Sequence, residues 1–212
     1  MSIDNLPVQY NVRISVLRDG EVVEKRESHN VLTNTGRAWL AKLVGANAYP
    51  VGGDPTPHTP DRIKFMGLGC GGSLQTGANL LKFQSATVDV TNLEDAVPFK
   101  AGPNNTNYYL KQVTPQATNT TFFPTAYRTR FILEIAENEI SYAGSTTAGS
   151  NQAVGTNVPI SEAGLYLSSA PSGGLVTPAA AKTLGSMVCY DTFSPIVITP
   201  NVMVRIEWEL RF

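Results

Sequence analysis

The sequence predicts an all-β fold: an antiparallel β-sandwich or barrel-like domain that carries one short amphipathic helix and long loops. Residues 202–212 alternate apolar and polar side chains without a break, which is typical of a strand with one buried face. Only 16% of the residues are charged, and the 18 Gly and 14 Pro suit many short strands joined by turns. Because 212 residues can bury a sizeable core, we expect a single β-rich domain over residues 1–212.

The first predicted element is a hairpin over about residues 8–28. Apolar side chains alternate with polar ones from Val8 to Val16, and Asp19-Gly20 tolerates the positive φ of a tight hairpin turn. The returning segment, residues 22–27, is rich in charge, so we expect it to form an exposed edge of the sheet.

A helix is predicted next, over about residues 35–44. Thr33, Asn34 and Thr35 offer oxygens that can cap its start, and Gly45 is suited to end it. An apolar stripe follows helical spacing: Ala38, Trp39, Leu40, Leu43 and Val44. We expect this single helix to cover one open side of a sheet, with Trp39 as its large anchor.

The remaining strands and loops occupy residues 62–212. Strands are predicted at 62–66, 86–90, 126–135, 139–142, 159–167, 187–190, 193–198 and 202–212, and Gly164 allows a bulge or a close backbone approach. Pro and Gly make residues 46–60 an irregular loop, and 143–157 and 168–182 are also predicted as loops. No linker separates two cores.

Charge and hydropathy exclude several classes of partner. Lys and Arg total 16 against 17 Asp and Glu, so there is no electrostatic case for nucleic acid or an anionic membrane. No apolar run approaches the roughly 20 residues that span a bilayer. The N-terminus does not resemble a signal peptide, and we therefore expect Cys70 and Cys189 to be free thiols in a protein made in a cytoplasm.

One motif formally matches the dinucleotide-binding fingerprint: Gly67-x-Gly69-x-x-Gly72, with Asp89 about twenty residues further on. The fingerprint requires a helix that opens at the glycines, yet residues 73–78 carry no helical stripe. A tight glycine turn at a strand end is the favoured interpretation.

Other chemical motifs are equally sparse. Cys70 could act as a nucleophile with His29 or His58, but a small thiol packed in a glycine turn is the favoured interpretation. Two histidines and two distant cysteines do not support a zinc site. The carboxylate pairs 94–95 and 137/139 are interpreted as solvated loop and strand charges. We therefore predict no catalytic residue, no cofactor and no metal, and a protein that is not an enzyme.

Five short stretches follow one another along the chain: residues 29–37 (HNVLTNTGR) before the helix, then 65–69 (FMGLG), 160–166 (ISEAGLY), 192–196 (TFSPI) and 206–212 (IEWELRF). In this order they resemble a type of small virion structural protein of tailed bacteriophages. The resemblance implies a non-enzymatic particle component, either a capsid decoration protein or a tail or baseplate subunit, assembled in the host bacterial cytoplasm. Its implied partners are the major capsid or tail and baseplate subunits, and further copies of itself.

The candidate contact residues are polar positions of the last strand and prolines of the first long loop: Arg205, Glu207, Glu209, Arg211, Pro55 and Pro57. The alternative is a receptor- or carbohydrate-binding β-sandwich module of a tail fibre, for which Tyr108 and Tyr109 would supply exposed aromatic rings.

Overall fold

The computed structural model describes residues 10–44, 62–76, 80–83, 85–97, 99–100, 107–118, 128–140, 158–167 and 187–211. Sheet A has five strands in the order β10 (Thr114–Thr118), β11 (Arg128–Ile135), β14 (Met203–Arg211), β1 (Tyr10–Arg18) and β2 (Glu21–His29). Sheet B has β3 (Val31–Leu32), β13 (Met187–Ile198), β12 (Val158–Leu167), β4 (Ile63–Gly69) and β9 (Lys111–Gln112). Two small sheets pair β5 (Ser73–Thr76) with β6 (Leu80–Phe83), and β7 (Phe99–Lys100) with β8 (Asn107–Tyr108).

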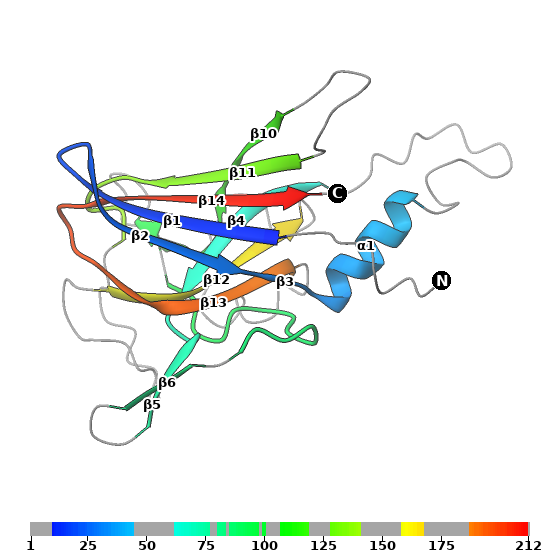
Figure 1. The fold of residues 1–212 in the computed structure, drawn as a ribbon, viewed down its shortest axis with the longest axis horizontal. Helices are drawn as coiled ribbons and strands as arrows, with labels where there is room; N and C mark the ends of the chain where they lie inside the picture. Colours follow the sequence, from blue (N-terminus) through cyan, green and yellow to red (C-terminus); the bar gives the residue numbers. More distant parts are fainter. Residues whose placement is uncertain are drawn as a thin grey trace, which may run out of the picture.

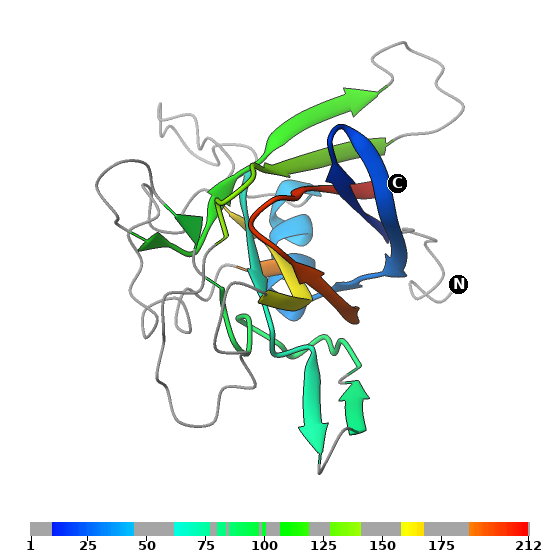
Figure 2. The same cartoon turned by 90° about the vertical axis from the view of Figure 1, so that its left-hand side faces the viewer.

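The two large sheets face each other as the layers of a sandwich (Figures 1 and 2). Every strand pair in the described residues is antiparallel. Within these residues no strand of sheet A pairs with a strand of sheet B, so the sheets do not close into a barrel. The predicted all-β class is confirmed, and of its two forms the sandwich is the one present.

The final strand, β14, lies in the middle of sheet A, between β11 and β1. Trp208 is fully buried and lies opposite Val12 on one side and Phe131 on the other. The predicted apolar face of this strand is confirmed, since these side chains are all buried: Val202, Val204, Ile206, Trp208 and Leu210. Phe212, also expected in the core, lies outside the described residues.

The hairpin of β1 and β2 has the turn that its sequence predicts. Asp19 and Gly20 have φ values of 53° and 82°, as a tight two-residue hairpin turn requires. β2 is an edge strand of sheet A, as expected, and the pairing register shifts between Val16 and Leu17. Such a bulge increases the local twist at the end of the hairpin.

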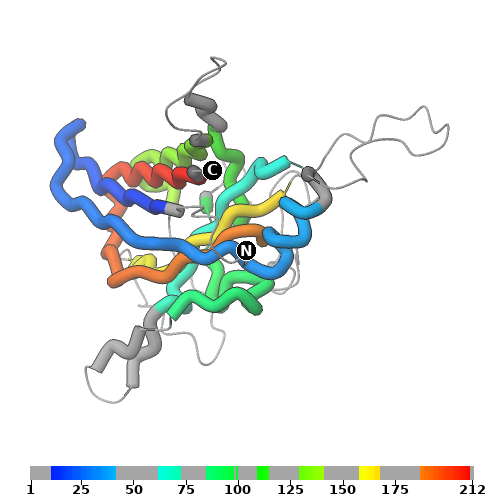
Figure 3. Tube along the Cα trace, turned by 45° about the vertical axis from the view of Figure 1, so that its right-hand side comes forward, coloured from blue at the N-terminus to red at the C-terminus, as the bar shows by residue number. Residues whose placement is uncertain are grey.

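The helix α1 (Asn34–Val44) begins after Thr33, whose hydroxyl oxygen accepts the Gly36 N–H at 3.1 Å. It packs against β3 and β13 at the edge of sheet B, at one end of the sandwich (Figures 1 and 3). A Cβ on Gly36 would lie 2.1 Å from the Val188 carbonyl oxygen, so glycine permits this close approach. Trp39 is only partly buried, but it does pack against the main core.

The strand predicted at 86–90 is wrong, and the one predicted at 139–142 is wrong at residues 139–140, while 141–142 lie outside the described residues. Residues 86–90 belong to an irregular segment, 85–97, because Asn34 donates to the Val88 carbonyl oxygen and to Asp89 Oδ1, both at 2.7 Å. Residues 136–139 form a turn whose Asn138 has a φ of 61°, and Ile140 makes only an isolated bridge with Phe99. The strands predicted at 187–190 and 193–198 are one strand, β13. The loops predicted at 46–60, 143–157 and 168–182 lie outside the described residues.

Among the described residues, none of the helical segments has the length and hydropathy to cross a membrane.

Candidate functional site

Three of the predicted contact residues, Arg205, Glu207 and Glu209, lie on the outer face of sheet A, on the side of β14 opposite Trp208. The strand register places Glu209 beside Asn11 and Arg130, and Glu207 beside Arg13 and Ile132. Pro55, Pro57 and the side chain of Arg211 lie outside the described residues.

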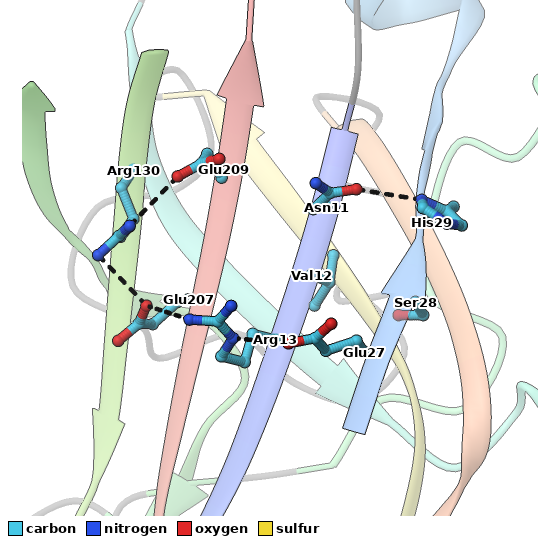
Figure 4. Close-up of a pocket in the computed structure, with 9 residues that line it drawn as sticks. All are labelled: Asn11, Val12, Arg13, Glu27, Ser28, His29, Arg130, Glu207 and Glu209. Carbon is cyan, nitrogen blue, oxygen red and sulfur yellow. Dashed lines mark hydrogen bonds and ion pairs between the residues drawn. The ribbon is translucent and has the colours of Figure 1, made fainter. Parts of the chain in front are cut away.

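Charged side chains on this face form a network of ion pairs that crosses four strands (Figure 4). Glu207 lies at its centre, with oxygens 3.0 Å from Arg205 Nε, 3.4 Å from an Arg130 nitrogen and 4.0 Å from an Arg13 nitrogen. Arg130 also pairs with Glu209 at 3.2 Å, and Arg13 with Glu27 at 3.0 Å. The network therefore pairs charges of both signs within the chain.

Glu207 and Glu209 lie on the outer face of sheet A, as expected, but their side chains are largely buried there. Glu209 is only 8% exposed, and the side chain of Glu207 is 17% exposed. Both lie on a central strand and are flanked by long basic side chains from the neighbouring strands, which cover them.

A depression of about 250 Å³ opens over the same network (Figure 4). Its lining is polar and charged apart from Val12, and it includes Asn11, His29 and Arg130. None of its lining residues is Phe, Tyr or Trp, the side chains whose large rings usually stack on sugars. Tyr109, expected as an exposed ring, is instead buried at 6% exposure, and the side chain of Tyr108 is not described.

An apolar row crosses the end of the same face, next to the hairpin turn. It consists of Val22 on β2, Leu17 on β1 and Met203 on β14, since Leu17 lies opposite both of the others. Val22 is 58% exposed and Met203 is 40% exposed. In the sequence, Met203 is marked only as an outward position of an alternating strand. The row itself depends on the alignment of three strands, which the sequence does not give.

Gly67 and Gly69 lie at the end of strand β4, and Gly72 lies in the tight turn that joins β4 to β5. The predicted glycine turn at a strand end is therefore present, and a strand follows it where a nucleotide-binding fold has a helix. A Cβ on Gly69 would lie 2.2 Å from Glu162 Oε1, and one on Gly72 would lie 2.0 Å from the Ser161 carbonyl oxygen. The Glu162 side chain and the Ser161 backbone, both of β12, therefore occupy the space that side chains at these glycines would need.

Glu162 is completely buried, and four groups donate hydrogen bonds to its carboxylate. Oε1 accepts the N–H groups of Asp95 at 2.8 Å and Gly71 at 3.0 Å. Oε2 accepts the Glu94 N–H at 3.0 Å and the Tyr190 hydroxyl at 2.8 Å. Burial raises the pKa of Glu162, and these hydrogen bonds oppose that rise. The carboxylate fastens segment 85–97 to the glycine turn and to β12.

Sequence reasoning noticed Glu162 only as part of a short motif and assigned it no role. The available signal was a single acidic residue within a strand that is otherwise mostly apolar, since a buried carboxylate needs hydrogen-bond donors.

Both cysteines are free, as predicted, and both are buried. Burial raises the pKa of each thiol, and for Cys70 the nearby Asp95 and Glu162 add to the rise. His29 belongs to sheet A, where its Nδ1 lies 3.1 Å from Asn11 Oδ1, whereas Cys70 follows β4 of sheet B. His58 lies outside the described residues. The structure therefore places Cys70 in a packed turn and His29 on another surface.

The expectation for the carboxylate pairs is right for Glu94 and Glu137, which are exposed in an irregular segment and in a turn, and wrong for Glu139. Glu139 is not a solvated strand charge: it lies in a turn, where its Oε2 is 2.6 Å from Lys111 Nζ and accepts the Ala136 N–H at 2.8 Å. The backbone N–H groups of Glu94 and Asp95 donate hydrogen bonds to the Glu162 carboxylate. In the described part of the chain, no group of three or more His, Cys, Asp or Glu could hold a metal ion.

Asp191 on β13 joins the two sheets, because it accepts a hydrogen bond from the Ser28 hydroxyl of β2. It is 1% exposed, and burial raises its pKa to about 6, against the opposing effects of the hydrogen bonds from Ser28 and Thr192. Between pH 4 and 6 the folded state therefore holds this proton more tightly than the unfolded state. The stabilisation of the fold by the protonated Asp191 carboxyl, relative to the ionised form, is fully present below pH 4 and is lost as the pH rises through 6.

We expect Asp191→Asn to remove this part of the pH dependence, which amounts to roughly 3 kcal/mol. Urea unfolding at several pH values from 4 to 8 measures it: relative to wild type, the variant should gain stability as the pH rises. Glu134→Gln is the matched control, since its side chain is 62% exposed and its removal should preserve the wild-type slope. Parallel profiles for Asp191→Asn and wild type would contradict the prediction.

Comparisons with protein families, with curated proteins and with solved structures found no match to this chain.

Proposed function

We propose that this protein is a non-enzymatic structural subunit of a tailed-bacteriophage particle, and that it binds neighbouring virion subunits on the capsid surface or in the tail or baseplate. The observation that carries the proposal is the apolar row on a regular sheet, in which exposed Val22 and Met203 flank the half-buried Leu17. The order of short motifs along the chain, from residues 29–37 to 206–212, supplies the link to phage virions.

The apolar row supports a contact function because its members are neighbours on three strands. Single exposed apolar residues are common on protein surfaces, whereas a contiguous group marks a site of association. The ion-pair network beside the row is a weaker candidate, since its charges are already paired within the chain, and breaking these pairs would offset what a partner's charges gained.

The roles of the potentially reactive groups also support a non-enzymatic protein. Glu162 holds a loop, both thiols are buried, and Asp191 joins the two sheets. Each of these groups is engaged in maintaining the fold.

The polar depression of sheet A favours a second candidate, a receptor- or carbohydrate-binding module of a tail fibre. Asn11, His29 and Arg130 could donate hydrogen bonds to hydroxyl groups there. It is the weaker candidate because none of its lining residues is Phe, Tyr or Trp. A glycan or host-cell binding assay that stays negative at high protein concentration would remove its support.

Mass spectrometry of purified particles, with copy numbers, tests the leading proposal. Hundreds of copies would indicate the capsid, and about a dozen or fewer would indicate the tail or baseplate. A protein that is produced during infection but is missing from purified particles would contradict the proposal.

A further inference from the structure

We propose that the turn of Asp19 and Gly20 is a site of spontaneous covalent modification, at which Asp19 rearranges to isoaspartate. The reaction needs only water and the chain itself, so the inference goes beyond the proposed function and does not depend on it. The turn thereby carries chemistry of its own besides connecting β1 to β2.

The rearrangement joins two groups that are neighbours in the chain, which makes it an intramolecular reaction. The Gly20 nitrogen attacks the side-chain carboxyl carbon of Asp19, the new C–N bond closes a succinimide ring, and the carboxyl OH leaves with the amide proton as water. A second water molecule then opens the ring. Attack at the side-chain carbonyl restores aspartate, whereas attack at the main-chain carbonyl breaks its bond to the Gly20 nitrogen and leaves isoaspartate. The water that is lost is regained, so no oxidant or other reactant is consumed.

Gly20 leaves its nitrogen open to this attack. Because glycine has no Cβ, no side chain on residue 20 shields the nitrogen from the approaching carboxyl carbon. A Cβ built on Gly20 would meet no atom of the described residues within 4 Å, its chain neighbours aside, so the space around the turn is open as well. The hairpin pairing ends at Arg18 and Glu21, which leaves the Gly20 N–H outside the strand ladder.

The turn also lies where the backbone can change conformation at little cost. Ring closure moves the Gly20 nitrogen towards the carboxyl carbon of Asp19, so the backbone must leave the geometry of the tight turn. Residues 18–23 are all exposed, and they form the tip of an edge hairpin that projects from the sandwich (Figure 3). Opening this tip therefore breaks few buried contacts.

The other described aspartates lack this combination of features. Asp89 is exposed, but a branched valine follows it, and its Oδ1 already accepts a hydrogen bond from Asn34 at 2.7 Å. Asp95 is half-buried and is followed by alanine, and Asp191 is only 1% exposed. Within the described part of the chain, Asp19 is therefore the favoured site.

Isoaspartate would alter the surface beside the turn. Its main chain runs through the side-chain carbons, which lengthens the loop by one atom, and the register of a hairpin depends on its loop. The pairs affected first are Arg18 with Glu21 and Leu17 with Val22. Because Leu17 and Val22 belong to the apolar row, the modification should disrupt one end of this row while the core strands stay paired.

Peptide mapping of the full chain after prolonged incubation at neutral pH tests the proposal. Electron-transfer fragmentation distinguishes isoaspartate from aspartate, which have the same mass, and the succinimide is lighter by one water. Isoaspartate should accumulate faster at Asp19 than at Asp89, Asp95 and Asp191, which are controls within the same molecule. Equal accumulation at Asp19 and Asp89 would overturn the inference.

Two variants that tolerate the positive φ of the turn should change the rate in opposite directions. Gly20→Asn places a side chain beside the attacking nitrogen, so the modification should slow severalfold, while asparagine still accepts a positive φ. Asp19→Asn retains a favoured hairpin pair and should give the same isoaspartate severalfold faster, because ammonia leaves in place of water. Circular dichroism melting verifies that both variants are folded. A folded Gly20→Asn variant that is modified as fast as wild type would contradict the proposed attack.

Hydrogen exchange of the separated isoaspartate form measures the structural consequence. Amides at the end of the hairpin, around Leu17 and Val22, should lose protection, whereas those of β14 around Trp208 should keep theirs. An isoaspartate form with the protection pattern of the unmodified protein would show that the loop absorbs the extra atom, and the predicted effect on the apolar row would then be wrong.

Discussion

Glu162→Ala should lower the free energy of unfolding by about 4 kcal/mol or more, because it leaves one buried and two partly buried N–H groups without their acceptor. Each unsatisfied buried donor costs about 1–3 kcal/mol, and the Tyr190 hydroxyl loses its acceptor as well. The lost contacts hold segment 85–97 against β4 and β12, so this segment should lose its hydrogen-exchange protection before the rest of the sandwich does.

Glu162→Gln should cost less, about 2 kcal/mol, because the amide keeps one oxygen and nearly the same shape. The amide NH₂ group replaces one carboxylate oxygen, and because it is itself a donor it cannot accept the two hydrogen bonds that this oxygen received. Glu134→Ala is the control, since that carboxylate is largely exposed and pairs with Arg205 at 3.4 Å on the surface. Urea unfolding measures all three, and equal midpoints for Glu162→Ala and Glu134→Ala would show that the buried carboxylate is not holding the segment.

Trp208→Ala should destabilise the protein by about 3–5 kcal/mol, the usual cost of removing a large aromatic side chain from a core. Trp208 is fully buried at the centre of sheet A, between Val12 and Phe131, and belongs to the main core cluster. Its removal opens a cavity, since the strands on both sides are fixed by their hydrogen bonds and cannot close over it.

Trp208→Phe should recover much of the loss, because a smaller ring leaves a smaller cavity. Met203→Ala on the same strand is the matched control: Met203 is 40% exposed, and its truncation should change stability by about 0.5 kcal/mol or less. Thermal unfolding followed by circular dichroism ranks the variants. If Trp208→Ala melted within a degree or two of Met203→Ala, the central place of Trp208 in the core would be wrong.

Local patterns were sufficient to predict much of the fold. Strict alternation identified β14 and its buried face, Asp19-Gly20 identified the hairpin turn, and Thr33 with the apolar stripe identified α1. Each of these signals acts over a few residues, through side-chain direction, backbone φ or capping, so it can be read from the chain before the fold is known.

Long-range contacts decided the remainder. Segment 85–97 has a strand-like composition near residue 88, yet hydrogen bonds from Asn34 and the carboxylate of Glu162 hold it in an irregular course. Alternation likewise predicted that Glu209 would be solvent-exposed, but its position on a central strand beside Arg130 buries it. Partners that lie more than 50 residues away in sequence impose these outcomes, and no local propensity encodes them.

The candidate surface, too, follows partly from local sequence patterns and partly from long-range contacts. The sequence alone is enough to establish an all-β chain whose last strand has one apolar and one polar face, because side chains alternate between the faces of a strand. Only the tertiary structure places Val22, Leu17 and Met203 in one exposed row and pairs the charges beside it. The physical reason is register: which side chains of neighbouring strands meet depends on how the strands align, and that alignment is set by the packing of the whole core.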